Sequence, residues 1–303
     1  MPATFTTSLF LFALVLAPLA EAQMHARHQA PPPARIEIPR DGAFFPMQDF
    51  GGRPVVEAKI DGKGPYRFIL DTGANISVIG AELNRELSLS APAGVNAASA
   101  GGGPAPALVA IHELRMGDAV LGDMIAAVMP LGGLLKGENA PQGVLSAASF
   151  PGYLLVYDFP AKRISVTKGA LTAADSQSIF EYAADQDLPT VPIWVAGHNT
   201  HVHLDTGSGF GLTLPATFLS LLPLASQPKE DGHVRLPGGE FPVSTARVDG
   251  PIELGKYKLE LAQVQFSDAR AGPGPAIGNI GYVVLRQFVV TLDSKNRRVK
   301  MDR

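Results

Sequence analysis

Two stretches decide the fold: Phe68-Ile-Leu-Asp-Thr-Gly-Ala74 and His203-Leu-Asp-Thr-Gly-Ser208. The aspartate of the second stretch, Asp205, follows that of the first, Asp71, by 134 positions in the chain of 303 residues. In each stretch the glycine lets the chain turn sharply and brings backbone N–H groups close to the carboxylate, which stabilises its ionised form. A single Asp-Thr-Gly is typical of an ordinary turn with a solvated aspartate. The interpretation therefore depends on whether the surrounding sequence also recurs.

The surrounding sequence does recur, in the same order and with nearly the same spacing. Four further pairs of segments lie 135 positions apart: Pro54-Val-Val and Pro189-Thr-Val, Gly143-Val-Leu and Gly278-Asn-Ile, Tyr157-Asp and Leu292-Asp, and Lys162-Arg-Ile and Arg297-Arg-Val. Chance could supply one repeated tripeptide, but a whole frame of landmarks in register indicates an internal repeat. The sequence therefore predicts two tandem copies of one structural unit.

Each copy is predicted to consist mainly of short strands. The first copy has Val55–Ile60 and Tyr66–Leu70 around a glycine-containing turn, and the second has Val191–Val195 and His201–Leu204. The strands expected to close the two copies are Tyr153–Tyr157, Ile164–Thr167, Phe288–Leu292 and Val299–Met301. Helices are expected only at Ala81–Leu89 and, as its counterpart, at Phe218–Leu222. The 32 glycines and 26 prolines also favour strands and turns over long helices.

The N-terminus has the pattern of an export signal. Leu9–Leu19 is an apolar run of the length of a signal-peptide core, too short for a comfortable membrane span, and Ala20-Glu-Ala22 after it suits signal peptidase. We therefore predict a signal peptide at residues 1–22 and a periplasmic or secreted bacterial protein without a stable membrane span after cleavage. An uncleaved anchor is the alternative, because no Lys or Arg precedes the apolar run.

The rest of the chain is predicted to divide into four parts. Residues 23–39 form a flexible, proline-rich segment with regular structure beginning near Arg35, and residues 169–188 form a linker. The two copies occupy residues 40–168 and 189–303. The chain contains no cysteine, which excludes disulfides and a thiolate nucleophile and fits a bacterial periplasm. The formal net charge of −3 gives no electrostatic argument for binding nucleic acid.

The two aspartates suggest acid–base chemistry. Two homologous lobes related by a pseudo-twofold axis would bring Asp71 and Asp205 side by side, and the hydroxyls of Thr72 and Thr206 could bond across the lobes. Two carboxylates in contact hold one proton between them. The ionised member can take a proton from water while the other donates to a carbonyl oxygen. This chemistry needs neither a metal nor a covalent nucleophile, and we expect no cofactor.

The segment Phe68–Ile79 resembles the active-site segment of retropepsin-like aspartic proteases, and His203–Ser208 resembles a second, pepsin-style copy. Gly143–Ser146 and Gly278–Gly281 stand where this family has its hydrophobic-hydrophobic-Gly motif. The resemblance covers about residues 40–301. It implies a mostly β fold of two tandem acid-protease-like β-barrel lobes with a central cleft between them, and a monomer that hydrolyses peptides or unfolded proteins.

The resemblance also assigns roles to individual residues. Asp71 and Asp205 would be catalytic. The residues that support the pair would be Thr72, Gly73, Thr206, Gly207 and Ser208. The family covers its cleft with a flap, for which the glycine-rich candidates are Gly101, Gly102, Gly103, Gly238 and Gly239.

Two departures from the family pattern keep a second hypothesis open. Ser146 stands where the first copy should have a glycine, although Gly281 keeps it in the second, and neither candidate flap contains an aromatic residue. The alternative is a catalytically weak or inactive protein that binds extended peptides in the cleft. In addition, Ala74 lacks the hydroxyl of Ser208, so the two carboxylates need not have equal environments.

Three histidines of the second copy raise the question of a metal site. His201, His203 and Asp205 alternate along one expected strand, and His198 precedes them. No matching ligand set occurs in the first copy, where Arg67 and Ile69 take the places of His201 and His203. We therefore expect a structural or solvated role for these histidines and no metal.

Overall fold

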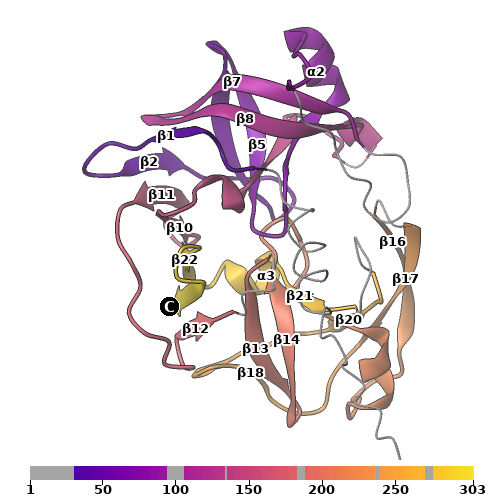
Figure 1. Ribbon diagram of the computed structural model, residues 1–303. Helices are drawn as coiled ribbons and strands as arrows, with labels where there is room; N and C mark the ends of the chain where they lie inside the picture. The colour runs from indigo at the N-terminus through magenta and orange to yellow at the C-terminus, as the bar shows by residue number, and fades with distance from the viewer. Residues whose placement is uncertain (1–30, 94–105, 134, 183–187, 237–238, 270–275) are drawn as a thin grey trace, which may run out of the picture.

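The computed structural model describes residues 31–93, 106–133, 135–182, 188–236, 239–269 and 276–303. These residues form a mostly β protein with three sheets and a few short helices (Figure 1). The predicted signal peptide at residues 1–22 and the candidate flap residues Gly101, Gly102, Gly103 and Gly238 lie outside the described residues. Within the described residues, no helix is long and apolar enough to cross a bilayer.

The first sheet has eight strands and occupies the upper part of Figure 1. Its strands follow the order β1-β8-β6-β9-β5-β4-β3, and β7 pairs with β4 and β8. They are β1 (Arg35–Glu37), β3 (Gln48–Asp49), β4 (Pro54–Ile60), β5 (Lys63–Asp71), β6 (Ser77–Gly80), β7 (Leu108–Met116), β8 (Ala119–Met129) and β9 (Gly143–Ser146). The first described strand thus begins at Arg35, where the sequence predicts the start of regular structure.

The second large sheet has nine strands and occupies the lower part of Figure 1. Its strands follow the order β16-β17-β20-β15-β21-β14-β13-β18-β19. They are β13 (Thr190–Val195), β14 (His198–Leu204), β15 (Leu212–Leu214), β16 (Lys229–Leu236), β17 (Gly239–Ala246), β18 (Ile252–Leu254), β19 (Tyr257–Lys258), β20 (Val264–Phe266) and β21 (Gly278–Ile280).

The inner strands of these two sheets follow the same order of parallel and antiparallel pairings. In the first sheet β5 is parallel to β9, β9 is antiparallel to β6, and β6 is parallel to β8. In the second sheet β14 is parallel to β21, β21 is antiparallel to β15, and β15 is parallel to β20. As a result, Asp71 ends and Asp205 directly follows an inner strand that has a parallel neighbour.

A six-stranded sheet joins strands from distant parts of the chain, in the order β12-β23-β22-β10-β11-β2. Its strands are β2 (Ala43–Pro46), β10 (Leu154–Asp158), β11 (Arg163–Thr167), β12 (Ile179–Glu181), β22 (Val289–Asp293) and β23 (Arg298–Asp302). At its centre β10 pairs with β22, which correspond to the first of the two predicted closing strands of each copy. The segment 169–188, predicted as a linker, contributes β12 to this sheet by pairing with β23.

The helices are short. The helix α2 (Ala81–Leu87) ends two residues before the predicted end at Leu89, and the next residue, Ser88, adopts a left-handed conformation with φ of 55°. The segment predicted as a helix at 218–222 is instead a 3-10 turn, η3 (Ala216–Ser220). The others are the 3-10 turns η1 (Leu131–Gly133) and η2 (Ala147–Ser149) and the helix α3 (Tyr282–Leu285).

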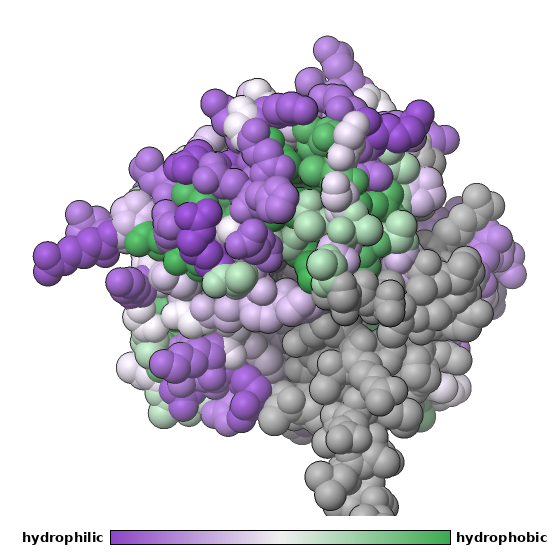
Figure 2. All heavy atoms as spheres, turned by 45° about the horizontal axis from the view of Figure 1, so that its top comes forward, coloured by the Kyte–Doolittle hydropathy of each residue, from purple (hydrophilic) through white to green (hydrophobic). Residues whose placement is uncertain are grey.

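One continuous apolar core spans all three sheets. Alternating residues of β10 point into it, including Leu155 and Tyr157, as the two-residue period of a strand requires. Its largest fully buried side chains include Phe68, Phe150, Phe180, Phe266 and Phe288. Hydrophilic side chains cover much of the outer face that carries β7, β8 and α2, with hydrophobic residues visible between them (Figure 2). Burial of this core fixes the positions of β5 and β14, and polar side chains lie at the ends of these two strands.

Candidate active site

The two aspartates stand at equivalent points of their sheets. Asp71 is the last residue of β5, after a strand whose buried Phe68 and Leu70 belong to the core, and it lies in register with Ser146 of β9. Asp205 directly follows β14, and its backbone N–H donates to the Ile280 carbonyl at 2.9 Å. The apolar strands anchor the backbone, so each carboxylate emerges from a fixed position at a strand end.

The two Asp-Thr-Gly turns are joined by reciprocal hydrogen bonds between buried threonines. The Thr72 N–H donates to Thr206 Oγ1 and the Thr206 N–H donates to Thr72 Oγ1, both at 3.0 Å. Thr206 Oγ1 also donates to the Leu70 carbonyl at 2.8 Å, and Thr72 Oγ1 donates to the Leu204 carbonyl. Each hydroxyl therefore both donates and accepts across the interface, which holds the two turns against each other.

The glycines of the turns allow the carboxylates to approach. Asp71 Oδ1 accepts N–H bonds from Gly73 of its own turn at 2.7 Å and from Gly207 of the other turn at 3.1 Å. A Cβ atom at Gly73 would lie 2.8 Å from Asp205 Oδ1, and one at Gly207 would overlap the Asp71 carboxylate. Both predicted catalytic residues thus pack against the glycine of the opposite turn, which leaves no room for a larger residue at either position.

Burial and mutual repulsion favour one shared proton. Burial, followed by the charge of Asp205, raises the pKa of Asp71 to about 7. Burial also raises the pKa of Asp205, and this is opposed by hydrogen bonds from Asn279, Gly207 and Ser208 and by the charge of Arg53. The pair therefore favours a proton on Asp71 over one on Asp205, whose carboxylate accepts a further hydrogen bond from the Asn279 side chain.

Ser208 acts mainly through its backbone. Its N–H donates to the Asp205 carbonyl at 3.2 Å, and its Oγ accepts a long bond of 3.4 Å from the Phe210 N–H. The predicted supporting residues Thr72, Gly73, Thr206, Gly207 and Ser208 are thus all brought together around the two carboxylates.

Arg53 is part of this site and was not predicted from the sequence. Its Nε donates to the Gly207 carbonyl at 2.7 Å and its Nη1 donates to the Gly51 carbonyl at 3.2 Å. Its charge lowers the pKa of both aspartates. The arginine therefore braces the second turn from a loop of the first half. Its only signal in the sequence is its position directly before the landmark at Pro54.

Asn279 is the second contributor that was not predicted as a site residue. Its Nδ2 donates to Asp205 Oδ2 at 2.9 Å. It belongs to the Gly278–Gly281 segment, which stands where aspartic proteases have their hydrophobic-hydrophobic-Gly motif. A polar residue in the middle of that motif is the signal that could have identified it.

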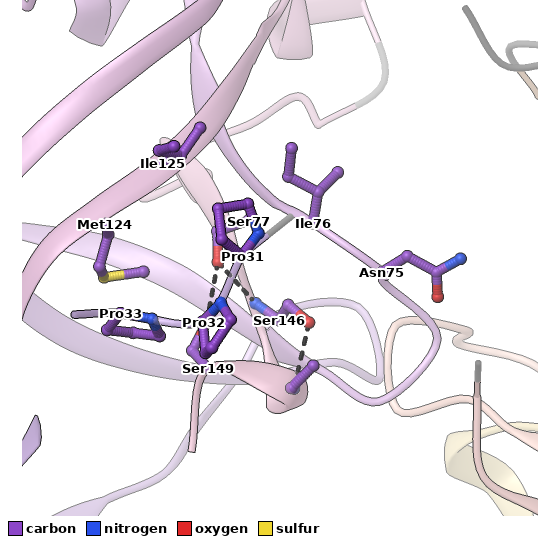
Figure 3. Close-up of a pocket in the computed structure, with 11 residues that line it drawn as sticks. Pro31, Pro32, Pro33, Asn75, Ile76, Ser77, Met124, Ile125, Ser146 and Ser149 are labelled. Carbon is purple, nitrogen blue, oxygen red and sulfur yellow. Dashed lines mark hydrogen bonds between the residues drawn. The ribbon is translucent and has the colours of Figure 1, made fainter. Parts of the chain in front are cut away.

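Ser146 is accommodated behind the first turn. Its Oγ donates to the Ala74 carbonyl at 2.5 Å and accepts from the Ala148 N–H at 3.1 Å. Its own N–H donates to Ser77 Oγ at 3.1 Å (Figure 3). The second half differs, because a Cβ atom at Gly281 would lie 2.6 Å from the Phe210 carbonyl oxygen. The serine of the first half thus fills space with a hydrogen-bonded hydroxyl where the second half needs a glycine.

Of the candidate flap residues, Gly239 lies within the described part of the chain. It begins β17, which pairs antiparallel with β16, and Gly239 is in register with Leu236. Gly239 therefore lies at one end of the paired strands β16 and β17.

The three histidines do not converge on a metal site. His198 and His201 are exposed on β14, whereas His203 is half-buried, and burial lowers its pKa. Among the residues that the structure describes, no group of three or more His, Cys, Asp or Glu side chains could hold a metal ion.

A comparison with protein families agrees with the first half of the site. Residues 56–147 match the family model described as aspartyl protease, a range that contains Asp71, Thr72, Gly73 and Ser146. The match supports a protease hydrolase that acts on peptides. A search of curated proteins found no match to the chain.

Proposed function

We propose that this protein is an exported aspartic endopeptidase in which Asp71 and Asp205 together activate water to hydrolyse peptide bonds. The observation that carries the proposal is the placement of the Asp71 carboxylate, which accepts N–H groups from both turns at once. A solvated turn aspartate would not be buried against the equivalent turn of another strand. The aspartyl protease match over the first half supports the same reading.

The reaction assigns one proton transfer to each aspartate. Asp205, as the anion, takes a proton from the attacking water, whose oxygen bonds to the carbonyl carbon, and Asp71 gives its proton to the carbonyl oxygen. When the tetrahedral intermediate collapses, the C–N bond breaks and the leaving nitrogen receives the proton from Asp205. Asp71 then recovers a proton from a hydroxyl of the intermediate, so both residues return to their starting states.

We further propose that the chain is a duplication, with lobes at residues 40–168 and 189–303 related by a pseudo-twofold axis around a central cleft. The matching order of parallel and antiparallel pairings in the two large sheets supports this arrangement. The reciprocal bonds between Thr72 and Thr206 support it as well, since each residue plays the role of the other. One chain that carries both halves is expected to act as a monomer.

The first test is hydrolysis itself. The purified protein is expected to cleave an unfolded protein substrate and to be inhibited by pepstatin, with no effect of a metal chelator. Cleavage should decline as pH rises through about 7, because Asp71 then loses the proton that it donates. Initial rates between pH 4 and 9 measure this profile. Peptide binding without cleavage at any of these pH values would instead favour the non-catalytic alternative.

Export is the second part of the proposal to be tested. Expression of the full chain in a bacterium should give a mature protein that begins at Gln23, because signal peptidase cleaves after Ala22. N-terminal sequencing of the periplasmic or secreted fraction checks this. A cell-associated product that still begins at Met1 would show that the apolar segment Leu9–Leu19 is an anchor.

A further inference from the structure

A polar pair beside Asp205 has no counterpart beside Asp71. His203 of β14 and Asn279 of β21 lie in register on neighbouring parallel strands. At the same register of the first sheet, Ile69 of β5 faces Val144 of β9. The two halves thus share their backbone pairing here and differ in the chemistry of the side chains next to the catalytic carboxylate.

The polar pair makes a direct contact with the carboxylate. Asn279 Nδ2 donates to Asp205 Oδ2 at 2.9 Å, whereas the aliphatic side chain of Val144 has nothing to donate to Asp71. An amide N–H pointed at a carboxylate favours its ionised form. A protonated Asp205 would prefer the amide oxygen, so the orientation of the Asn279 amide is coupled to the location of the proton.

The remaining polar atoms of the pair show how this orientation can be held. Asn279 Oδ1 and His203 Nδ1 are both buried without a hydrogen-bond partner. His203, Asn279 and Asp205 share one face of the sheet, since Asp205 follows His203 by two positions and Asn279 is in register with His203. A neutral imidazole with its proton on Nδ1 has the donor that Asn279 Oδ1 lacks, and the register places the two residues on neighbouring strands. A hydrogen bond between these two atoms would keep the Asn279 amide hydrogens directed at Asp205.

We propose that Asn279 is a positioning residue that fixes Asp205 as the ionised member of the catalytic pair, and that His203 holds the Asn279 amide in the required orientation. The role in catalysis rests on the proposed peptidase function. Two other titratable or charged groups face the catalytic pair Asp71 and Asp205, and both are unchanged in every variant below. One is Arg53 from the loop after β3. The other is Tyr157 from β10, and the pKa of Tyr157 is raised by burial and by Asp71.

The experiment replaces the polar pair with the residues of the first half. Asn279→Val and His203→Ile are compared with the wild type and with His201→Ile, a control two residues earlier on the same face of the strand, where the side chain is exposed. Loss of the amide donor should move the acidic limb of kcat/KM to higher pH by about one unit, because the Asp205 pKa rises. His203→Ile should move it in the same direction by less, and His201→Ile should leave it in place.

A second readout does not depend on activity. Titration of the aspartate side-chain carboxyl carbons by NMR, with the Asp205 signal assigned from Asp205→Asn, should show a higher pKa for Asp205 in Asn279→Val. Asn279→Leu, which is close to the asparagine in shape, replaces Asn279→Val if the latter does not fold.

The two readouts separate the positioning role from the function. If the wild type does not hydrolyse peptides, the peptidase function is overturned. If Asn279→Val nevertheless has a higher Asp205 pKa than the wild type in the NMR titration, the positioning role is still supported. Hydrolysis with an unchanged acidic limb and an unchanged Asp205 titration in Asn279→Val would overturn the positioning role alone.

Discussion

Asp71→Asn and Asp205→Asn should each lower kcat/KM for an unfolded protein substrate by at least about 1,000-fold. Neither variant can carry both proton transfers, because an amide neither accepts a proton from water nor donates a carboxylic acid proton at these pH values. The substitutions keep the shape of the side chain, so the bonds from Gly73 and Gly207 to position 71 lose strength without loss of space. Initial rates with each purified variant measure the effect.

The combination of the two substitutions makes the test sharper. Because the carboxylates act as one unit, the double variant should be no less active than the weaker single variant, within about threefold. The exposed Asp249→Asn serves as the matched control and should retain wild-type rates. Near-UV circular dichroism confirms that each variant is folded. Cleavage that survives Asp205→Asn at wild-type rates would refute the shared mechanism.

The backbone of this site could be predicted from the sequence because it depends on local patterns that recur. The strands at 54–60 and 190–195 have alternating or continuous apolar residues and are followed by glycine turns, and both form at those places. The pairing of Thr72 with Thr206 agrees with the same repeat, because a hydroxyl at each equivalent position can bond to the other turn. Comparison of the two copies thus predicts contacts between residues at equivalent positions.

The contacts that break the repeat could not be predicted in this way. Arg53 bonds to Gly207 over a separation of 154 positions, and its equivalent before Pro189 is Leu188, so comparison of the two copies discards it. Asn279 was not predicted because it lies in a segment that does match the other copy, and that segment resembles an apolar motif. The helix expected at 218–222 is a 3-10 turn, because Pro215 and Pro223 bound a segment too short for a stable α-helix.

The second large effect concerns stability. Asp71→Asn should stabilise the protein against unfolding at pH 8 by a few kcal/mol, on the order of 4 at most, and by close to nothing at pH 4. The reason is that burial and Asp205 raise the Asp71 pKa from 3.8 to about 7 in the folded state. Between these two values the folded protein binds a proton that the unfolded chain has released. The free energy of unfolding of the wild type therefore falls as pH rises through this window, and the amide removes that dependence.

Urea unfolding of the wild type and Asp71→Asn at pH 4, 6 and 8 measures the difference, and its growth with pH is the decisive feature. Asp249→Asn provides the control, since an exposed carboxylate should change stability by less than about 0.5 kcal/mol at every pH. A variant that matches the wild type at pH 8 would show that Asp71 is already ionised at little cost, and the pair would then hold no shared proton. A gain at pH 8 together with lost cleavage would mean that the catalytic arrangement is maintained against the stability of the fold, because the burial and the repulsion that destabilise the ionised pair also keep a proton available for transfer.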